Sequence, residues 1–150
     1  MSGLVVGAAL IAGLTGCAGT VSMQPAEGAN SPDCAAVTVR LPAVVDGQPR
    51  QWTDAQATGA WGSPSSVLLT CGLETPGPST LQCETVGGVD WLIDNSEAPL
   101  YRFTSFGRTP AVEVFLDYDV VSGRDALAAV SPAVALLPET GSVCTPRVTG

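Results

Sequence analysis

The placement of five cysteines is the feature that most constrains what this chain can fold into. Cys17 stands apart from the others, directly after an apolar run from Leu4 to Leu14 and two small residues. An odd cysteine count is unusual for an exported protein, in which cysteines normally pair. Setting Cys17 aside leaves an even set, which predicts two disulfides formed in an oxidising compartment. The four remaining cysteines are Cys34, Cys71, Cys83 and Cys144.

The N-terminal apolar run is too short to span a membrane, which takes ~20 residues, and it is typical of a signal peptide. The run ends in Leu14-Thr15-Gly16-Cys17, which is typical of a lipobox, where cleavage leaves an N-terminal cysteine that carries lipid. We therefore expect residues 1–16 to be a lipoprotein signal peptide and Cys17 to be lipidated. Met1-Ser2-Gly3 lacks the usual basic residue, which we interpret as a start codon further upstream. The alternative is an ordinary leader that leaves Cys17 as a plain thiol.

Composition divides the rest of the chain. Residues 17–32 are small, polar and turn-prone, so we expect the lipidated cysteine to be followed by a flexible tether with a reach of about 20 Å. Residues 33–147 are expected to form a single globular domain, which suits a chain of 150 residues, and residues 148–150 a tail.

The charged residues exclude several classes of function. The chain has a net charge of −8, six arginines and no lysine or histidine. This composition excludes nucleic acid as an expected partner, because phosphate binding needs clustered cations, and it disfavours adhesion to anionic lipid by charge alone. The absence of histidine and lysine excludes Ser-His-Asp and Cys-His nucleophiles, histidine-ligated metal sites and Schiff bases. We expect no catalytic residue, no cofactor and no metal.

Five segments carry the pattern of strands. They are residues 67–71, 81–86, 89–94, 100–106 and 112–120. Gly87-Gly88 predicts a hairpin between the second and the third. The last alternates strictly, and Val112, Val114, Leu116, Tyr118 and Val120 are expected to face the core.

Two segments are expected to be helical. Asp33 is a predicted cap for a helix that starts at Cys34 and carries Val37, Leu41, Val44 and Val45 at helical spacing, interrupted by Pro42. Ser122 is a predicted cap, with Asp125 three residues on, for a helix through Ala126, Leu127 and Val130 that Pro132 breaks or restarts. The predicted fold class is α+β: a small antiparallel sheet of about four to five strands, two or three helices packed on one face, and two disulfides.

Four cysteines allow three pairings. The turn-rich residues 75–80 predict a hairpin that brings Cys71 and Cys83 together, and Cys34 would then pair with Cys144 and join the two ends of the domain. The alternatives are free thiols or a metal site, although the close Cys-x-x-Cys pairs of a zinc site are missing.

Three ordered motifs resemble a known family. They are Ala60-Trp61-Gly62-Ser63-Pro64 leading into Leu69-Thr70-Cys71-Gly72, then Gly88-Val89-Asp90-Trp91-Leu92, then the run from Phe103 to Val114. Together they resemble an uncharacterised family of actinobacterial secreted proteins and lipoproteins, a domain of unknown function of the 3515 type. The resemblance implies an envelope location and disulfide bonding, and it carries over no catalytic residue.

Arg108 is the most interesting candidate for a binding residue. It lies between Gly107 and Pro110, in a loop that could present it rigidly to a carboxylate or phosphate. We favour an internal ion pair with Asp90 or Glu113, which is the commoner role of such an arginine.

Two tryptophans are further candidates. Trp61 and Trp91 could line a groove for a sugar or peptide, although we favour a role as core anchors, and Trp52 is expected to be partly exposed. The candidate ligand or partner surface thus comprises Trp61, Asp90, Trp91 and Arg108.

Six carboxylates could in principle serve glycoside hydrolysis, or some of them could hold Ca²⁺. We favour a solvated role, because charges suit an exposed strand face and the spacing does not fit a calcium loop. The six are Asp90, Asp94, Glu97, Glu113, Asp117 and Asp119.

The predicted function is that of a non-catalytic lipoprotein. It is expected on the extracytoplasmic face of the cell membrane, attached by lipid on Cys17, as a binding or scaffolding module facing the cell wall or periplasm. Its partner would be an envelope protein complex or a cell-wall component. The alternatives are a carboxylate-dependent cell-wall hydrolase and a small anionic-ligand binder that uses Arg108.

Overall fold

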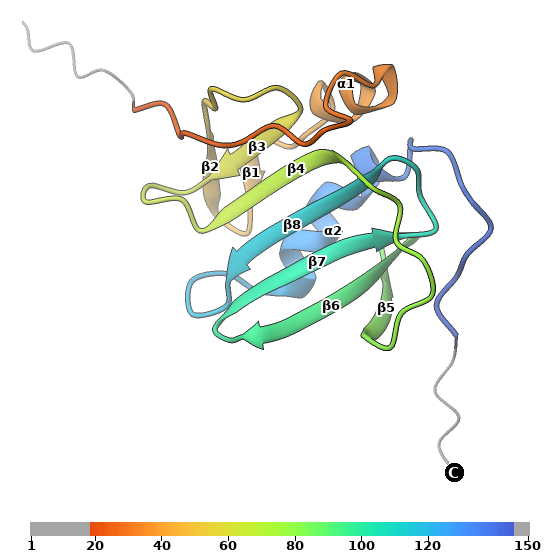
Figure 1. The fold of residues 1–150 in the computed structure, drawn as a ribbon. Helices are drawn as coiled ribbons and strands as arrows, with labels where there is room; N and C mark the ends of the chain where they lie inside the picture. The colour runs from red at the N-terminus through yellow and green to blue at the C-terminus, as the bar shows by residue number, and fades with distance from the viewer. Residues whose placement is uncertain (1–18, 146–150) are drawn as a thin grey trace, which may run out of the picture.

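Residues 19–145 are described by a computed structural model, and within them the chain forms one eight-stranded antiparallel sheet and two short helices (Figure 1). The strand order is β1-β2-β3-β4-β8-β7-β6-β5. The predicted α+β domain of four to five strands and two or three helices is therefore wrong, and the fold is mostly β. The elements are α1 (Pro32–Thr38), β1 (Val44–Val45), β2 (Gln48–Gln51), β3 (Thr58–Trp61), β4 (Val67–Leu73), β5 (Gln82–Val86), β6 (Val89–Glu97), β7 (Leu100–Phe106), β8 (Ala111–Asp117) and α2 (Gly123–Val134).

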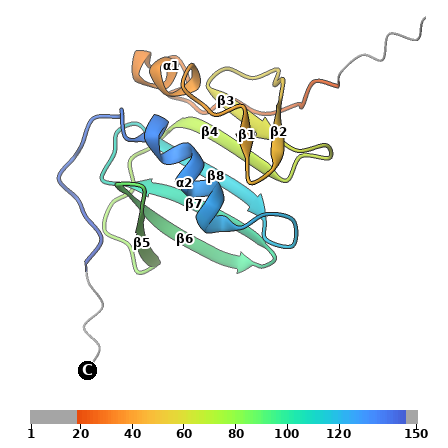
Figure 2. The same cartoon turned by 180° about the vertical axis from the view of Figure 1, so that it is seen from behind.

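The sheet curves around α2. This helix contacts both edge strands, β1 and β5, and also the central strand β8, and Figure 2 shows it crossing one face of the sheet. The smaller helix α1 packs against α2 and β4. The core lies between α2 and the enclosed face of the sheet, and its largest fully buried side chains include Trp61, Trp91, Leu69 and Leu116.

The strongest strand patterns are confirmed. β7 has the predicted bounds, and the predicted alternation holds in β8, where Val112, Val114 and Leu116 are fully buried. β8 ends at Asp117, so the remaining two apolar residues of the pattern lie beyond the strand and are exposed. The β5–β6 hairpin turns through Gly87-Gly88 with φ of 59° and 78°, the left-handed pair that a two-residue hairpin favours.

The sheet gains three strands that the sequence pattern did not predict: β1, β2 and β3. The predicted helical spacing holds only as far as Val37, because α1 ends at Thr38 and Val44–Val45 pair with β2 as a strand. Pro42 accounts for this break, since a proline removes a helix hydrogen bond and clashes with the preceding turn. The cap is Ser31 and not Asp33: the Ser31 hydroxyl accepts the Asp33 amide at 3.3 Å.

The second helix begins where predicted. Ser122 is its N-cap and accepts the Asp125 amide at 3.3 Å. Pro132 lies inside the helix without ending it. The carbonyl that loses its hydrogen bond belongs to Ala128, which is exposed to water, so the helix continues to Val134.

Two disulfides are present as predicted, but the predicted pairing is wrong. Cys34 bonds Cys71, with 5.6 Å between their Cα atoms, and Cys83 bonds Cys144, with 5.5 Å. The cause is the topology: β4 pairs with β3 and β8 in the middle of the sheet, whereas β5 pairs with β6 at its far edge. Residues 74–81 therefore cross between distant strands and do not close a hairpin.

The N-terminal residues that were expected to form a tether pack on the domain from Val21 onward. The Val21 amide donates to the Trp52 carbonyl at 2.8 Å, the Gly28 amide donates to the Gly72 carbonyl at 2.9 Å, and Ala29 is buried. Cys17 and the expected leader lie outside the described residues. Among the described residues, no helix is long and apolar enough to cross a membrane.

Candidate functional site

Arg108 fastens the turn between β7 and β8 to the end of α2. Its Nη1 donates to the carbonyls of Ala135 and Leu137 at 3.0 and 2.9 Å, and its Nη2 lies 3.1 Å from the Glu139 carboxylate and 3.4 Å from the Gly88 carbonyl. The side chain is only 11% exposed. The internal role that we favoured is present, but the ion-pair partner is Glu139 and not Asp90 or Glu113. A guanidinium engaged in this way offers an incoming anion little.

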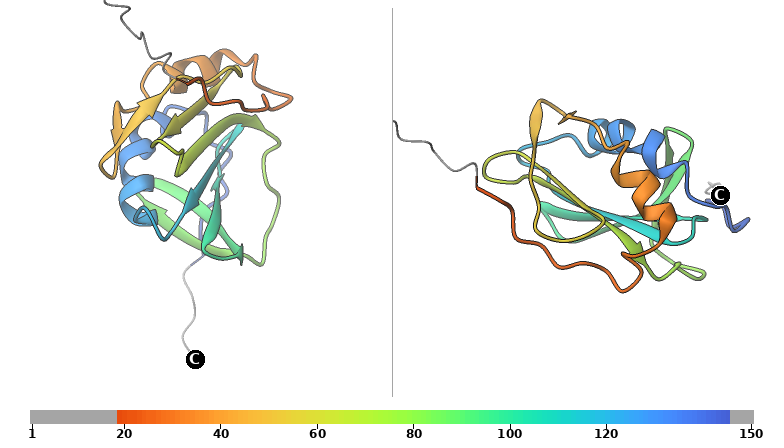
Figure 3. Two further views of the ribbon diagram at one scale, coloured as in Figure 1. Left: turned by 90° about the vertical axis from the view of Figure 1, so that its left-hand side faces the viewer. Right: turned by 90° about the horizontal axis from the view of Figure 1, so that it is seen from above.

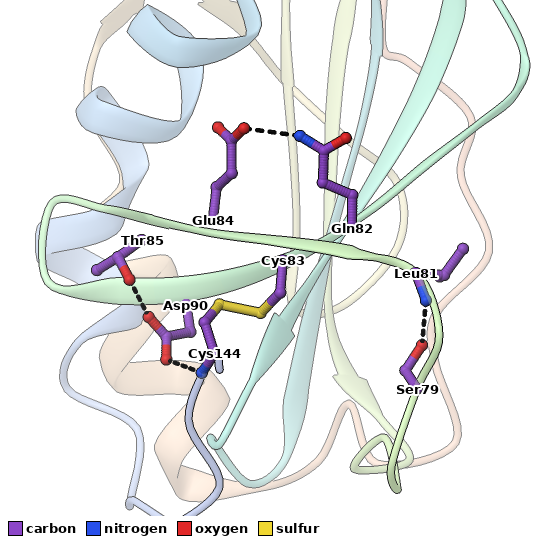
Figure 4. The surroundings of a disulfide bond; sticks show 8 residues. All are labelled: Ser79, Leu81, Gln82, Cys83, Glu84, Thr85, Asp90 and Cys144. Carbon is purple, nitrogen blue, oxygen red and sulfur yellow. Dashed lines mark hydrogen bonds between the residues drawn. A yellow bond between two sulfur atoms is a disulfide. The ribbon is translucent and has the colours of Figure 1, made fainter. Parts of the chain in front are cut away.

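Asp90 holds the C-terminal segment in place (Figure 4). Its carboxylate accepts a hydrogen bond from the Thr85 hydroxyl and another from the Cys144 amide, the latter at 2.7 Å. The same segment is bonded to β5 by the Cys83–Cys144 disulfide. Asp90 and Arg108 both line a cleft of about 250 Å³, but each side chain makes contacts that serve the fold.

The two tryptophans proposed for a groove are core residues. Trp61 and Trp91 are fully buried. The Trp61 Nε1 donates to the Pro42 carbonyl at 2.9 Å, which anchors the chain between α1 and β1. The predicted surface of Trp61, Asp90, Trp91 and Arg108 is therefore not one surface, because two of its four members lie inside the protein.

The candidate carboxylates do not gather in a cleft of the described residues. A hydrogen bond from the Ser96 side chain, followed by one from the Ser96 amide, lowers the pKa of Asp94, and Glu113 pairs with Arg102 at 3.1 Å on the sheet surface. None of the five clefts found among the described residues is lined by two of the six candidate carboxylates. Within residues 19–145 no group of three or more His, Cys, Asp or Glu residues could hold a metal ion. This arrangement supports neither the hydrolase function nor the calcium site that the sequence allowed.

A different feature stands out on the surface. Trp52 is 78% exposed, as expected for a partly exposed residue, and Val39 is 79% exposed. Both border a cleft of about 570 Å³, which we call the Trp52 groove. It lies between the end of α1, the end of β2 and the connection to β3, and its lining comprises Thr38, Val39, Arg50, Gln51, Trp52, Thr53, Ala55, Gln56, Ala57 and Thr58.

Hydrogen bonds fix the walls of the Trp52 groove. The Thr58 hydroxyl lies 2.8 Å from the Thr53 hydroxyl and donates to the Ala55 carbonyl at 2.6 Å. Arg50 reaches from β2 to the carbonyls of Leu41 and Thr38 at 3.3 and 3.4 Å. Partial burial lowers the pKa of Arg50 below its ordinary value.

The same wall is joined to the N-terminal segment. Val21 lies beside Thr53 in a parallel bridge, and the Asp54 amide donates to the Val21 carbonyl at 3.2 Å. The Asp54 carboxylate accepts the Met23 amide at 2.8 Å. This bond, followed by one from the Ser22 side chain, lowers the pKa of Asp54. The groove is thus built directly on the start of the described chain.

Sequence reasoning identified Trp52 as exposed but missed the groove. Val39 caps the end of α1, which is shorter than predicted, and Arg50 lies in β2, a strand that the sequence pattern did not predict. The available signal was an exposed tryptophan close in sequence to two arginines, Arg40 and Arg50, in a strongly acidic chain.

Residues 2–141 match the family described as "Protein of unknown function (DUF3515)". The chain belongs to this family. The match confirms the predicted domain of unknown function of the 3515 type, and it extends from the N-terminal apolar run to the loop that follows α2. Comparisons with curated proteins and with solved structures found no match.

Proposed function

We propose that this DUF3515 protein is a lipid-anchored, non-catalytic binding module on the extracytoplasmic face of the cell membrane. One observation carries the proposal. The two disulfides use Cys34, Cys71, Cys83 and Cys144, so Cys17 is bonded to none of them. Cys17 also ends the lipobox-like sequence, where a lipid-bearing cysteine belongs. Two disulfides fit an oxidising compartment outside the cytoplasm.

The attachment of the N-terminal segment is consistent with such an anchor. Val21 is bonded to the domain, and only the residues between it and Cys17 separate the domain from the proposed lipid. A chain spans at most about 3.6 Å per residue, so Cys17 lies within about 14 Å of Val21. The lipid would hold the domain directly against the membrane, at a shorter reach than the expected tether of residues 17–32.

The composition of the chain and the contacts of its charged residues favour a binding role. The chain has no histidine or lysine, and none of the five clefts among the described residues is lined by two of its candidate carboxylates. Arg108, the candidate for binding a small anion, uses its terminal nitrogens within the fold. A sheet closed by α2 and fastened by two disulfides suits a rigid module that docks on an envelope protein complex or a cell-wall component.

Mass spectrometry of the mature full-length protein tests the anchor. We expect a diacylglyceryl adduct on Cys17 as the N-terminal residue. The Cys17→Ala variant should lack the adduct and should leave the membrane fraction or remain an uncleaved precursor. A Gly16→Ala variant, which keeps a small residue before the cysteine, is the matched control and should behave like the wild type. Membrane fractionation of Cys17→Ala that equals the wild type, without lipid on either protein, would refute the anchor.

Crosslinking in intact membranes tests the binding role. We expect the lipidated protein to capture one or a few envelope partners reproducibly, and the Cys17→Ala variant to lose them. Turnover of a cell-wall substrate by the purified protein, with no specific partner recovered, would contradict a non-catalytic module.

A further inference from the structure

We propose that the Trp52 groove rests on the lipid bilayer and thereby fixes the orientation of the domain on the membrane. The inference rests on the lipid anchor proposed above, and it adds a second point of contact. Its occupant is the lipid surface itself, at the level of the headgroups and the first carbons of the acyl chains.

The first argument is reach. The Val21 amide donates to the Trp52 carbonyl at 2.8 Å, so Trp52 lies directly beside the start of the described chain. Cys17 is at most about 14 Å from Val21, and its acyl chains would insert in the bilayer. The headgroup region on each side of a bilayer is itself about 5 to 7 Å thick. The anchor therefore holds the Trp52 groove at the membrane surface.

The second argument is the arrangement of the fold. In Figure 1 the start of the described chain, helix α1 and the connection between β2 and β3 lie together at the top of the molecule. The described C-terminal segment lies at the far side, next to β5 and β6. The left-hand view of Figure 3 again shows α1 and the start of the described chain together at the top of the molecule. An anchor at this end turns the groove toward the bilayer and the β5–β6 edge away from it.

The third argument is the chemistry of the side chains. Trp52 and Val39 are more than three-quarters exposed, and a tryptophan ring is the side chain that membrane interfaces favour most, because it has an apolar body and a polar N–H. Arg40 follows Val39 directly and is exposed, so it stands where a lipid phosphate would lie, whereas Arg50 lines the groove but donates to the carbonyls of Leu41 and Thr38. Asp54 is the acidic residue next to this wall, and its carboxylate is turned to the Met23 amide.

Trp52 also provides the reporter for the test. The chain has three tryptophans, and the other two, Trp61 and Trp91, are fully buried. Emission that a soluble quencher can reach therefore comes from Trp52. The lipidated full-length protein would be reconstituted into neutral phosphatidylcholine vesicles that contain a fraction of lipids with brominated acyl chains.

Two results are expected on these vesicles. Brominated lipid should quench part of the tryptophan emission, and the quenching constant for iodide should fall at least twofold relative to the unlipidated Cys17→Ala protein in solution. The Trp52→Gln variant should still bind the vesicles through its lipid but should lose the quenching by brominated lipid. Val143→Ser, which changes an exposed apolar residue at the opposite end of the fold, is the matched control and should leave both measurements unchanged.

The outcomes separate this inference from the anchor. If the lipidated protein sediments with the vesicles while Trp52 remains as accessible to iodide as in solution, the orientation is wrong and the anchor stands. If Trp52 is accessible on lipid vesicles but protected in native membranes, its partner is a protein, and the inference is also wrong. If the mature protein carries no lipid on Cys17 by mass spectrometry, both the anchor and the orientation are refuted.

Discussion

Replacing Arg108 with alanine should lower the free energy of unfolding by about 2 to 4 kcal/mol. The side chain links three parts of the fold: the β7–β8 turn that carries it, the carbonyls of Ala135 and Leu137 at the end of α2, and Glu139 in the following loop. Alanine would leave these carbonyls without the charged donor, whose side chain is only 11% exposed.

The magnitude follows from the two short contacts. A hydrogen bond to a charged group contributes about 1.5 to 3 kcal/mol when its partner is withdrawn from water, and the lower end applies here because neither carbonyl is deep in the core. The pair with Glu139 adds less than about 1 kcal/mol, since that carboxylate is 74% exposed. The contact with Gly88 at 3.4 Å is too long to add much. The expected fall in melting temperature is about 10 °C for a domain of this size.

Urea unfolding followed by circular dichroism, with both disulfides oxidised, measures the change. Glu139→Gln is the matched control, because it removes the ion pair and keeps the two carbonyl contacts, and it should cost less than about 1 kcal/mol. An Arg108→Ala protein that melts within about 2 °C of the wild type would refute the reasoning. If that protein also lost affinity for a small anion, Arg108 would be a ligand-binding residue.

Two further perturbations test the fastening of the N-terminal half. Replacing Cys34 and Cys71 together with alanine should lower the free energy of unfolding by about 4 kcal/mol in urea titrations, the loop-entropy value for a sequence separation of 37 residues, and a loss below about 1 kcal/mol would contradict this. Asp54 has a lowered pKa when folded, so its stabilisation is complete above the ordinary aspartate pKa near 4 and is lost as the pH falls through the lower folded value. The stability difference between wild type and Asp54→Asn, measured by urea titration at pH 7 and at pH 3, should therefore shrink at the lower pH, and a difference that is equal at both would be inconsistent with this role.

The sequence patterns that were correctly interpreted are local ones. The alternation of Val112, Val114 and Leu116 identified β8, because a strand that covers a core on one side repeats every two residues. Gly87-Gly88 identified its hairpin, because a two-residue turn needs two left-handed residues. Ser122 identified the start of α2. Each signal is complete within a few neighbouring residues.

The missed elements depend on distant contacts. All four residues of β3 are buried, so Thr58–Trp61 carry no alternation, and β2 is a polar strand that contains Pro49. The disulfide pairing failed for the same reason: Leu69 in β4 lies opposite Val114 in β8, far along the chain, and not opposite β5. No local pattern shows which strands share an edge.

The Trp52 groove also has one feature that the sequence predicted and others that it did not. Trp52 was expected to be exposed because its sequence neighbours are polar, and it is. That Val39 and Val21 lie beside it follows from where α1 ends and from the bridge to Thr53, and both depend on the tertiary fold.

The observed disulfides also bear on the order in which the cysteines are oxidised. They join the first cysteine of the domain to the second and the third to the fourth, so the two covalent rings do not overlap along the sequence. In a chain that crosses a membrane N-terminus first, Cys34 and Cys71 emerge before Cys83. The first two thiols to arrive are therefore native partners, and so are the last two. Of the three pairings that four cysteines allow, this is the one expected when cysteines pair in the order in which they cross the membrane. In a chain exported in this way, disulfide formation would require an oxidant but little rearrangement of bonds, whereas in a nested pairing the first cysteine could bond only after the last had emerged.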